Sequence, residues 1–399
     1  MPSLRILYIH QYFRTPAQGS SSRSWYFTRA LADAGHRPVV ITAHNEVDYK
    51  CVNFEGVEVH YLPVYYDNAL SFRKRTAAFL KFVYRSIKLA RKLPIPDLAY
   101  VLSTPLTTGL IGLFLKKTRR IPFIFDVADL WPRAPIEIGA IRNGHIRRWL
   151  YELEGLIYRN AESVVALSPA IKQDICSRFE ELNVLMIPNM ADLDFFGGRE
   201  VESHPEGSHP FTIVYFGAAG LANHLEYMLD AAEACKLMSL PVSFWVIAEG
   251  GRLQHLKNLC ARRDLLSYVS FYDYMAKQEL TEKIAAADAV YISFKDLPVL
   301  ETGSPNKFFD GLAAGKMIIT NFQGWIGDLI KSENIGFSYP PGRPEQFAES
   351  LKPFIHDRER ANECGVRARQ LAARAFSRRE HTSRFVSLVE KTCQSRSGR

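Results

Sequence analysis

The residues best placed to do chemistry lie within residues 301–316, where a Gly-Ser-Pro turn precedes a helical pattern of apolar residues. Pro305 suits the first turn of that helix. A helix N-terminus presents free backbone N–H groups, and together with the side chain of Lys307 these can bind a phosphate group. Asp310, one turn further on, can accept hydrogen bonds from two ribose hydroxyls. These residues predict a nucleotide site, and an ordinary capped helix is the alternative.

Two glycine-rich loops follow predicted strands, and such loops let a backbone come close to a phosphate. The first contains Gly19, Ser20 and Arg23 and is predicted to approach a pyrophosphate or an acceptor. The second is a tight loop that begins at Gly217, ends at Gly220 and contains neither Lys nor Arg. The charge of a diphosphate would then be neutralised by the lysine of the later helix, by helix N-termini or by the arginine of the first loop.

Short apolar strands alternate with helical segments throughout the chain, which predicts an α/β protein with doubly wound parallel sheets. Residues 198–210 are polar and lack this periodicity, as expected of a linker. We therefore expect one Rossmann-like domain over residues 1–197 and a second over residues 211–375. In such sheets ligands bind at the carboxyl ends of the strands, so the two domains are expected to face a central cleft.

The length and composition agree with this organisation. The chain has 399 residues, of which 47% are hydrophobic, 23% charged and 12% aromatic, and this excludes a disordered, collagen-like or coiled-coil protein. Six scattered cysteines without a Cys-x-x-Cys pair argue against disulfides and zinc and indicate a reducing cytosol. We expect no signal peptide, no membrane span and, without an Asp-x-Asp motif or a His/carboxylate cluster, no metal.

Positive charge is concentrated in the first half of the chain. The net charge is +8, and residues 71–150 alone hold 16 Lys and Arg against four acidic residues, which indicates an anionic partner. Residues 71–93 combine eight basic residues with apolar residues at helical spacing. Such a basic amphipathic helix predicts contact with an anionic membrane surface. A core-facing helix with a solvated basic side is the alternative, and a nucleic-acid-binding protein is a further one that leaves Lys307 and Asp310 unexplained.

Residues 301–315 resemble the nucleotide-sugar signature of family 4, a large family of retaining GT-B glycosyltransferases. That signature has two acids separated by seven residues, followed by Ala-x-Ala-x-Gly. Asp310 falls on the second acid, which binds the ribose in the family. Thr302 stands at the position of the first acid, and the nearest carboxylate, Glu301, lies one residue earlier. Residues 304–310 look most like the WbuB-like transferases of O-antigen and capsule synthesis, which handle fucosamine-type sugars.

Other segments extend the resemblance over nearly the whole chain. Residues 126–132 are similar to the Asp-Leu-Trp-Pro segment of the same group, which faces the cleft, so Asp129 is given a polar role; capping a turn is the alternative. Residues 269–275 resemble the segment that holds the base of the donor. The end of the chain, residues 376–399, resembles the last helix of such enzymes, which crosses back to the first domain.

The resemblance therefore implies a GT-B fold with a donor site in the second domain. Three residues are expected near the reaction, Lys307, Glu301 and Asp129. The expected donor-binding residues are Gly217, Gly220, Tyr274, Met275, Ser304, Pro305, Asn306, Lys307 and Asp310.

The implied activity is that of a retaining transferase. It would move a sugar, for example an N-acetylated amino sugar, from a nucleoside diphosphate, with UDP favoured, to a polyprenyl-diphosphate-linked glycan. No cofactor or metal is expected, because the leaving diphosphate is stabilised electrostatically and can itself accept a proton. The expected location is the cytoplasm, at the inner face of the cell membrane. A sugar-nucleotide 2-epimerase of the same architecture is the alternative, and it would turn over the donor without an acceptor.

Overall fold

A computed structural model describes residues 2–16, 23–67, 70–196, 209–273, 275 and 277–397. The chain forms two compact units. Unit 1 comprises residues 1–188, 302–304 and 379–399, and unit 2 comprises residues 189–301 and 305–378. The units therefore divide at residue 188, ahead of the predicted linker, most of which lies outside the described residues.

Unit 1 is built on an eight-stranded sheet in the order β3-β4-β2-β1-β5-β6-β7-β8. All neighbouring strands are parallel except β3 and β4, which form an antiparallel hairpin at one edge that the sequence did not predict. The strands are β1 (Arg5–Ile9), β2 (Arg37–His44), β3 (Lys50–Phe54), β4 (Val57–Pro63), β5 (Leu98–Leu102), β6 (Phe123–Val127), β7 (Ser163–Ala166) and β8 (Val184–Met186).

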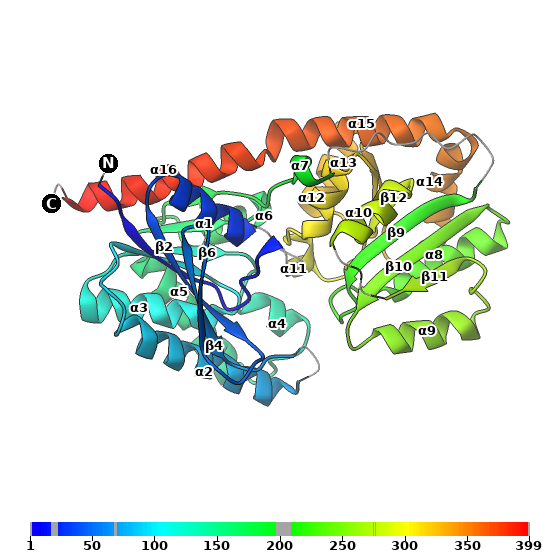
Figure 1. Ribbon diagram of the computed structural model, residues 1–399. Coiled ribbons are helices and arrows are strands. Elements are labelled where there is room, and N and C mark those ends of the chain that lie inside the picture. Colours follow the sequence, from blue (N-terminus) through cyan, green and yellow to red (C-terminus); the bar gives the residue numbers. More distant parts are fainter. Residues whose placement is uncertain are drawn as a thin grey trace. The chain divides into compact units, whose positions relative to one another are not determined.

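The helices of unit 1 connect these strands and cover the sheet (Figure 1). They are α1 (Arg23–Asp33), α2 (Phe72–Ala90), the short 3-10 helix η2 (Leu106–Thr108), α3 (Gly109–Arg119), α4 (Arg133–Glu137), α5 (Gly144–Asn160), α6 (Pro169–Arg178) and α16 (Arg378–Ser397). Helix α16 comes from the end of the chain, yet Phe385 stacks on Phe27 of α1 with 4.1 Å between the ring centres. The last helix is thus part of the core of unit 1.

Unit 2 contains a second sheet, with six parallel strands in the order β11-β10-β9-β12-β13-β14. Its strands are β9 (Phe211–Ala218), β10 (Val242–Glu249), β11 (Val269–Tyr272), β12 (Ala289–Ile292), β13 (Met317–Thr320) and β14 (Gly336–Ser338). Its helices are α7 (Leu193–Phe196), α8 (Glu226–Leu237), α9 (Leu253–Arg262), α10 (Lys277–Ala285), α11 (Pro298–Glu301), α12 (Asn306–Ala313), α13 (Gly324–Glu333), α14 (Pro344–His356) and α15 (Arg358–Ala375).

Strand β9 shows why this sheet needs helices on both faces. Tyr215 packs into a core formed with α8, α9 and α14, whereas its neighbour Val214 packs into a separate core formed with α12, α13 and α15. Successive side chains of a strand point to opposite faces, so a strand that is apolar throughout must be covered twice. The prediction of two doubly wound Rossmann-like sheets is confirmed, and each sheet offers the carboxyl ends of its strands as a site for ligands.

Candidate active site

Lys307 lies in the first turn of α12, next to the loop that follows β9. Its ammonium donates a hydrogen bond to the hydroxyl of Tyr215 at 3.1 Å and lies 4.4 Å from the centre of that ring. A methyl group added to Gly217 would come within 3.6 Å of its Cε atom and 3.7 Å of its Nζ atom. The end of a strand, a glycine-rich loop and a helix N-terminus therefore meet at this lysine.

The glycine-rich loop is fixed by a second turn that contains glycine. The backbone N–H of Ala219 donates to the carbonyl of Glu249 at 2.7 Å. Gly250 has φ of +132°, and a Cβ atom there would lie 2.8 Å from the carbonyl oxygen of Ala219, so only glycine fits. The turn holds the loop from Gly217 to Gly220 in position beside α12.

The surroundings of Lys307 suit an anionic ligand. Burial lowers the pKa of Lys307 to about 8, and Asp310, three residues later on the same helix face, acts in the opposite direction. The residue before the helix, Pro305, gives the first turn no side-chain hydrogen bond, although its carbonyl accepts from the N–H of Phe308 at 3.0 Å, so the N–H groups ahead of Phe308 are those that a ligand or water can bind. A bound phosphate would meet the ammonium, these N–H groups and the positive end of the helix dipole together.

Glu301 occupies a defined position in unit 2, at the end of α11. Its carboxylate accepts a hydrogen bond from the backbone N–H of Gln323 at 3.3 Å. Gly324 has φ of +72°, and a Cβ atom there would lie 2.9 Å from the Cβ atom of Glu301. The carboxylate thus lies at the N-terminus of α13, where the helix dipole stabilises a negative charge. Its contact with a donor sugar stays a prediction.

The remaining predicted donor residues have different surroundings. Asn306 is exposed at the start of α12, and Ser304 belongs to the short segment 302–304 that groups with unit 1. Met275 is half-buried and packs against the core beneath α12. Tyr274, the other predicted base contact, lies outside the described residues.

Arg23, predicted to approach a phosphate, is instead part of the interior of unit 1. It is the first residue of α1 and only 6% exposed, and it forms an ion pair with buried Asp126 of β6. A second guanidinium nitrogen donates to the carbonyl of Ile187 at 2.8 Å, and the hydroxyl of Tyr100 donates to the same carboxylate at 2.7 Å. Burial acts to lower the pKa of Arg23, but Asp126 more than offsets this, so the net pKa is raised. These contacts give the guanidinium a structural role within unit 1, and its approach to a phosphate stays a prediction.

The other predicted residues of unit 1 follow its strands. Asp129 is exposed on the loop after β6, where its carbonyl accepts a hydrogen bond from the N–H of Trp131 at 2.9 Å. This position suits both the predicted polar role and a turn-forming role. Gly19 and Ser20 lie outside the described residues.

A cavity of about 320 Å³ lies at the carboxyl ends of β1, β2 and β4 in unit 1, and the sequence did not reveal it. Gln11 lines the cavity and is 1% exposed, yet its amide nitrogen and oxygen have no partner among the described residues. The Nε2 atom of His44 in the same lining also has none there. Tyr12, Tyr61 and other aromatic residues complete the walls. Buried polar groups without partners next to aromatic rings suit a polar ligand with flat faces, such as a sugar.

Sequence families match both halves of the chain. Residues 18–190 match the glycosyl transferase 4-like domain, and residues 199–371 match the glycosyl transferases group 1. The chain is a glycosyltransferase of the GT-B fold. The first match agrees with the resemblance to family 4 noted above. A comparison with curated proteins finds no sequence match.

Solved structures share the fold of this glycosyltransferase. Sucrose-phosphate synthase from Thermosynechococcus elongatus aligns with a TM-score of 0.75 at 15% identity, over 98% of this chain and all of the other. HepE from Anabaena, solved with UDP-glucose, aligns at 0.68 and 15% identity, over 97% of this chain and all of the other. WaaG, a glycosyltransferase involved in lipopolysaccharide biosynthesis, aligns at 0.63 and 14% identity, over 97% and 98% of the two chains. The family matches establish a transferase, and the partner of the basic patch stays a prediction.

One expectation about metal ligands needs correction. Cys51, Glu58 and His60 have side-chain ligand atoms within 4.8 Å of one another on the hairpin of β3 and β4, and the imidazole of His60 donates from Nε2 to the Glu58 carboxylate at 2.6 Å. Cys51 and His60 are directly opposite in the hairpin, which the sequence did not predict. A His/carboxylate cluster therefore exists in the glycosyltransferase, although on the edge hairpin of unit 1 and not in the donor site. Metal-independent transfer stays a prediction.

Proposed function

We propose that this glycosyltransferase moves a sugar from a UDP-sugar to a hydroxyl of a lipid-linked glycan, with retention of the anomeric configuration. The observation that carries the proposal is the position of Lys307 between Tyr215, Gly217 and the N-terminus of α12. It supplies a cation and open backbone donors at one point, which is what a leaving diphosphate requires. Asp310, on the same face of the helix, would hold the ribose.

The reaction would need no covalent intermediate with the protein. As the glycosidic bond to the diphosphate breaks, Lys307 and the first N–H groups of α12 would stabilise the developing negative charge. The acceptor hydroxyl would form the new bond on the same face of the sugar and pass its proton to an oxygen of the departing phosphate. Glu301 and Asp129 would contact the reacting sugars.

Support for the choice of substrates comes from relatives of the fold. HepE was solved with UDP-glucose, and WaaG takes part in lipopolysaccharide biosynthesis. The resemblance of residues 304–310 to the WbuB-like group favours an N-acetylated amino sugar and a role in O-antigen or capsule synthesis. The cavity around Gln11 in unit 1 would receive the glycan part of the acceptor.

Helix α2 supports a site of action at the membrane. Its apolar face is buried in unit 1 through residues such as Phe82, Val83 and Ala90, which is the core-facing arrangement given above as the alternative. Its outer face, however, also carries exposed apolar side chains, with Leu80 at 52% and Tyr84 at 66%, among exposed basic residues such as Lys81 and Lys88. Apolar and cationic side chains on one exposed face are typical of helices that bind anionic lipid. None of the described helices is long and apolar enough to cross a bilayer.

The proposal is tested first by binding and then by transfer. Thermal unfolding of the full chain would be followed with UDP, GDP and their sugars, and UDP at 100 times its dissociation constant should stabilise the donor unit by about 2.7 kcal/mol. The stabilising sugar would then be incubated with a short-chain polyprenyl-diphosphate glycan, and the product analysed for its anomeric configuration. Release of sugar or of an epimer without an acceptor would favour the 2-epimerase, and an inverted product would overturn the retaining mechanism.

A further inference from the structure

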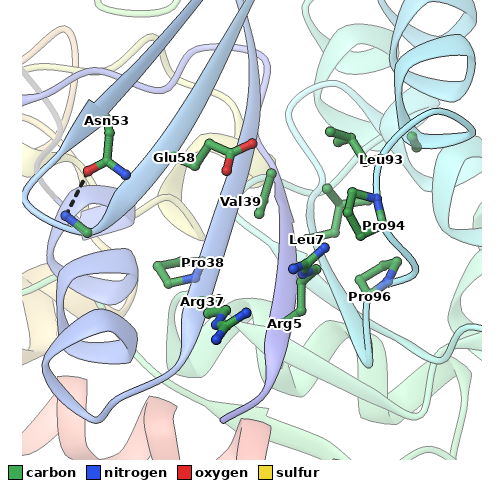
Figure 2. A pocket seen from close by; sticks show the side chains of 12 residues that line it. Arg5, Leu7, Arg37, Pro38, Val39, Asn53, Glu58, Leu93, Pro94 and Pro96 are labelled. Carbon is green, nitrogen blue, oxygen red and sulfur yellow. Dashed lines mark hydrogen bonds between the residues drawn. The ribbon is translucent and has the colours of Figure 1, made fainter.

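A second cavity in unit 1, of about 390 Å³, lies at the amino ends of β1 and β2 (Figure 2). Ligands of such sheets are expected at the other, carboxyl ends of the strands. Its walls come from the first residues of β1 and β2, from the hairpin of β3 and β4, and from the end of α2 with the Leu93–Pro96 turn that follows. The volume is within the range of small-molecule sites. A ligand here would not compete with the donor or with the acceptor.

Two arginines line this cavity from adjacent strands. Arg5 of β1 and Arg37 of β2 are paired in register, and neither side chain forms an ion pair or a hydrogen bond with the described residues. Figure 2 shows the guanidinium of Arg5 between Val39 and the prolines of the turn, with Arg37 at the edge. Like charges side by side in a sheet are destabilising. An anion placed between the two guanidinium groups would remove that cost.

The acidic groups nearby bond to groups other than these two guanidinium groups. The carboxylate of Asp97 accepts a hydrogen bond from the backbone N–H of Arg5 at 2.7 Å. Glu58, which also lines the cavity, bonds through its carboxylate to the imidazole of His60 at 2.6 Å. Two guanidinium groups therefore face the cavity without a protein anion bound to either.

The rest of the lining is mainly apolar. Leu7 and Val39 are buried residues that form part of the floor, and Leu93, Pro94 and Pro96 form the opposite wall. Guanidinium groups bind phosphate through two parallel hydrogen bonds, whereas the apolar walls gain from covering a hydrocarbon. We propose that this cavity binds the phosphate head group of a lipid together with the first part of its apolar chain. The proposal does not depend on the transfer reaction, because the site and its test involve binding alone.

The probe is dioctanoyl phosphatidic acid, kept below its micelle concentration and titrated into the full-length chain by calorimetry. Exchanging both arginines, in the double variant Arg5→Gln and Arg37→Gln, should weaken its binding by about tenfold or more, because two charge-assisted contacts are lost. A matched double variant, Arg148→Gln and Arg360→Gln, removes the same charge from exposed surface pairs and should bind as the unaltered chain does. Equal binding by all three proteins, or no binding to the unaltered chain, would overturn the proposal.

A second variant separates a lipid from a free phosphate. Leu93→Asn should weaken the binding of dioctanoyl phosphatidic acid severalfold and leave that of glycerol 3-phosphate unchanged, because only the lipid reaches the apolar wall. Hydrogen exchange should also slow in residues 90–97 when the lipid is bound. If glycerol 3-phosphate binds as tightly as the lipid, the site is one for soluble phosphates and the lipid proposal is wrong. Unchanged thermal unfolding of each variant in the absence of lipid serves as the folding control.

Discussion

Arg23 in unit 1 and Lys307 in unit 2 lie at similar positions in their units, but their side chains have different partners. Each lies in the first turn of a helix beside a parallel sheet, after a segment that contains glycine and serine. Arg23 is paired with the buried carboxylate of Asp126 and is also bonded to a backbone carbonyl. Lys307 has the hydroxyl and ring of Tyr215 for support, and no carboxylate forms an ion pair with it among the described residues.

A structural cation differs from one that binds a ligand in whether the protein itself balances the charge. A buried cation whose charge is balanced within the protein gains little from a further anion. A partly buried cation without such a partner is unfavourable in its charged form, and the lowered pKa of Lys307 reflects this cost. Under the proposed function, a bound diphosphate would recover this cost. The first site would then contribute to the stability of unit 1, and the second to donor binding in unit 2.

Asp126→Ala should have the largest effect. It leaves Arg23 as an uncompensated charge in the interior and also removes the acceptor of the Tyr100 hydroxyl. The unfolding transition of unit 1, followed in urea, should lose about 3–5 kcal/mol. Glu152→Gln, which breaks the exposed pair with Arg148, is the control and should cost less than about 0.5 kcal/mol. A loss in Asp126→Ala no larger than in this control would mean that Arg23 is not held as the structure indicates.

Lys307→Met should have the opposite pattern of effects. Removing one preorganised charge from the leaving group should cut sugar transfer by about 100-fold, while the stability of unit 2 changes by less than about 1 kcal/mol, because burial already disfavours the ammonium. Lys316→Met is a close control. Lys316 is also buried in unit 2 with its pKa lowered to about 8, but it donates to the carbonyl of Ala285. If both variants lose activity equally, Lys307 has no special role.

The sequence predicted much of the fold and could not separate these two cations. Strands that are apolar on both faces, alternating with helices, specify doubly wound sheets because each apolar face must be covered. Such local patterns also place Arg23 and Lys307 at helix starts. Whether a cation has a partner, however, depends on long-range contacts, and Asp126 is 103 residues away from Arg23 in the chain.

The same limit explains what the sequence missed in the candidate site. Gln11 follows β1 and His44 ends β2, and neither has a motif around it, so their shared cavity exists only after β1 and β2 pair. Cys51 and His60 meet through a hairpin whose first strand, β3, is exposed along its length and lacks an apolar pattern. The helix start at residues 305–307, which depends on local order, was by contrast predicted from the sequence alone.

The pH dependence of UDP binding should follow the ionisation of Lys307. With a pKa of about 8, Lys307 is charged at neutral pH, and a bound diphosphate stabilises that charge. UDP affinity should therefore be highest below pH 8 and fall as the pH rises above it, by at most about tenfold per pH unit. Calorimetric titrations between pH 7 and pH 9.5 would measure the change. Lys307→Met controls for ionisation of the uridine itself, and an equally steep decline in that variant would exclude the lysine as the cause.

Tyr215→Phe should have the smallest effect. The ring remains under the ammonium, so the cation–π contact is kept, and only the hydroxyl that bonds to Lys307 and to the carbonyl of Ala218 is lost. A hydrogen bond of this kind contributes about 1 kcal/mol, so UDP affinity should fall by about fivefold with transfer reduced in proportion. Tyr339→Phe removes another buried hydroxyl of unit 2, one that bonds to Tyr291 and not to Lys307, and should leave UDP binding unchanged. If the two variants weaken UDP binding equally, the loss reflects a loosened core, and Lys307 is then positioned by its helix alone and not by the tyrosine.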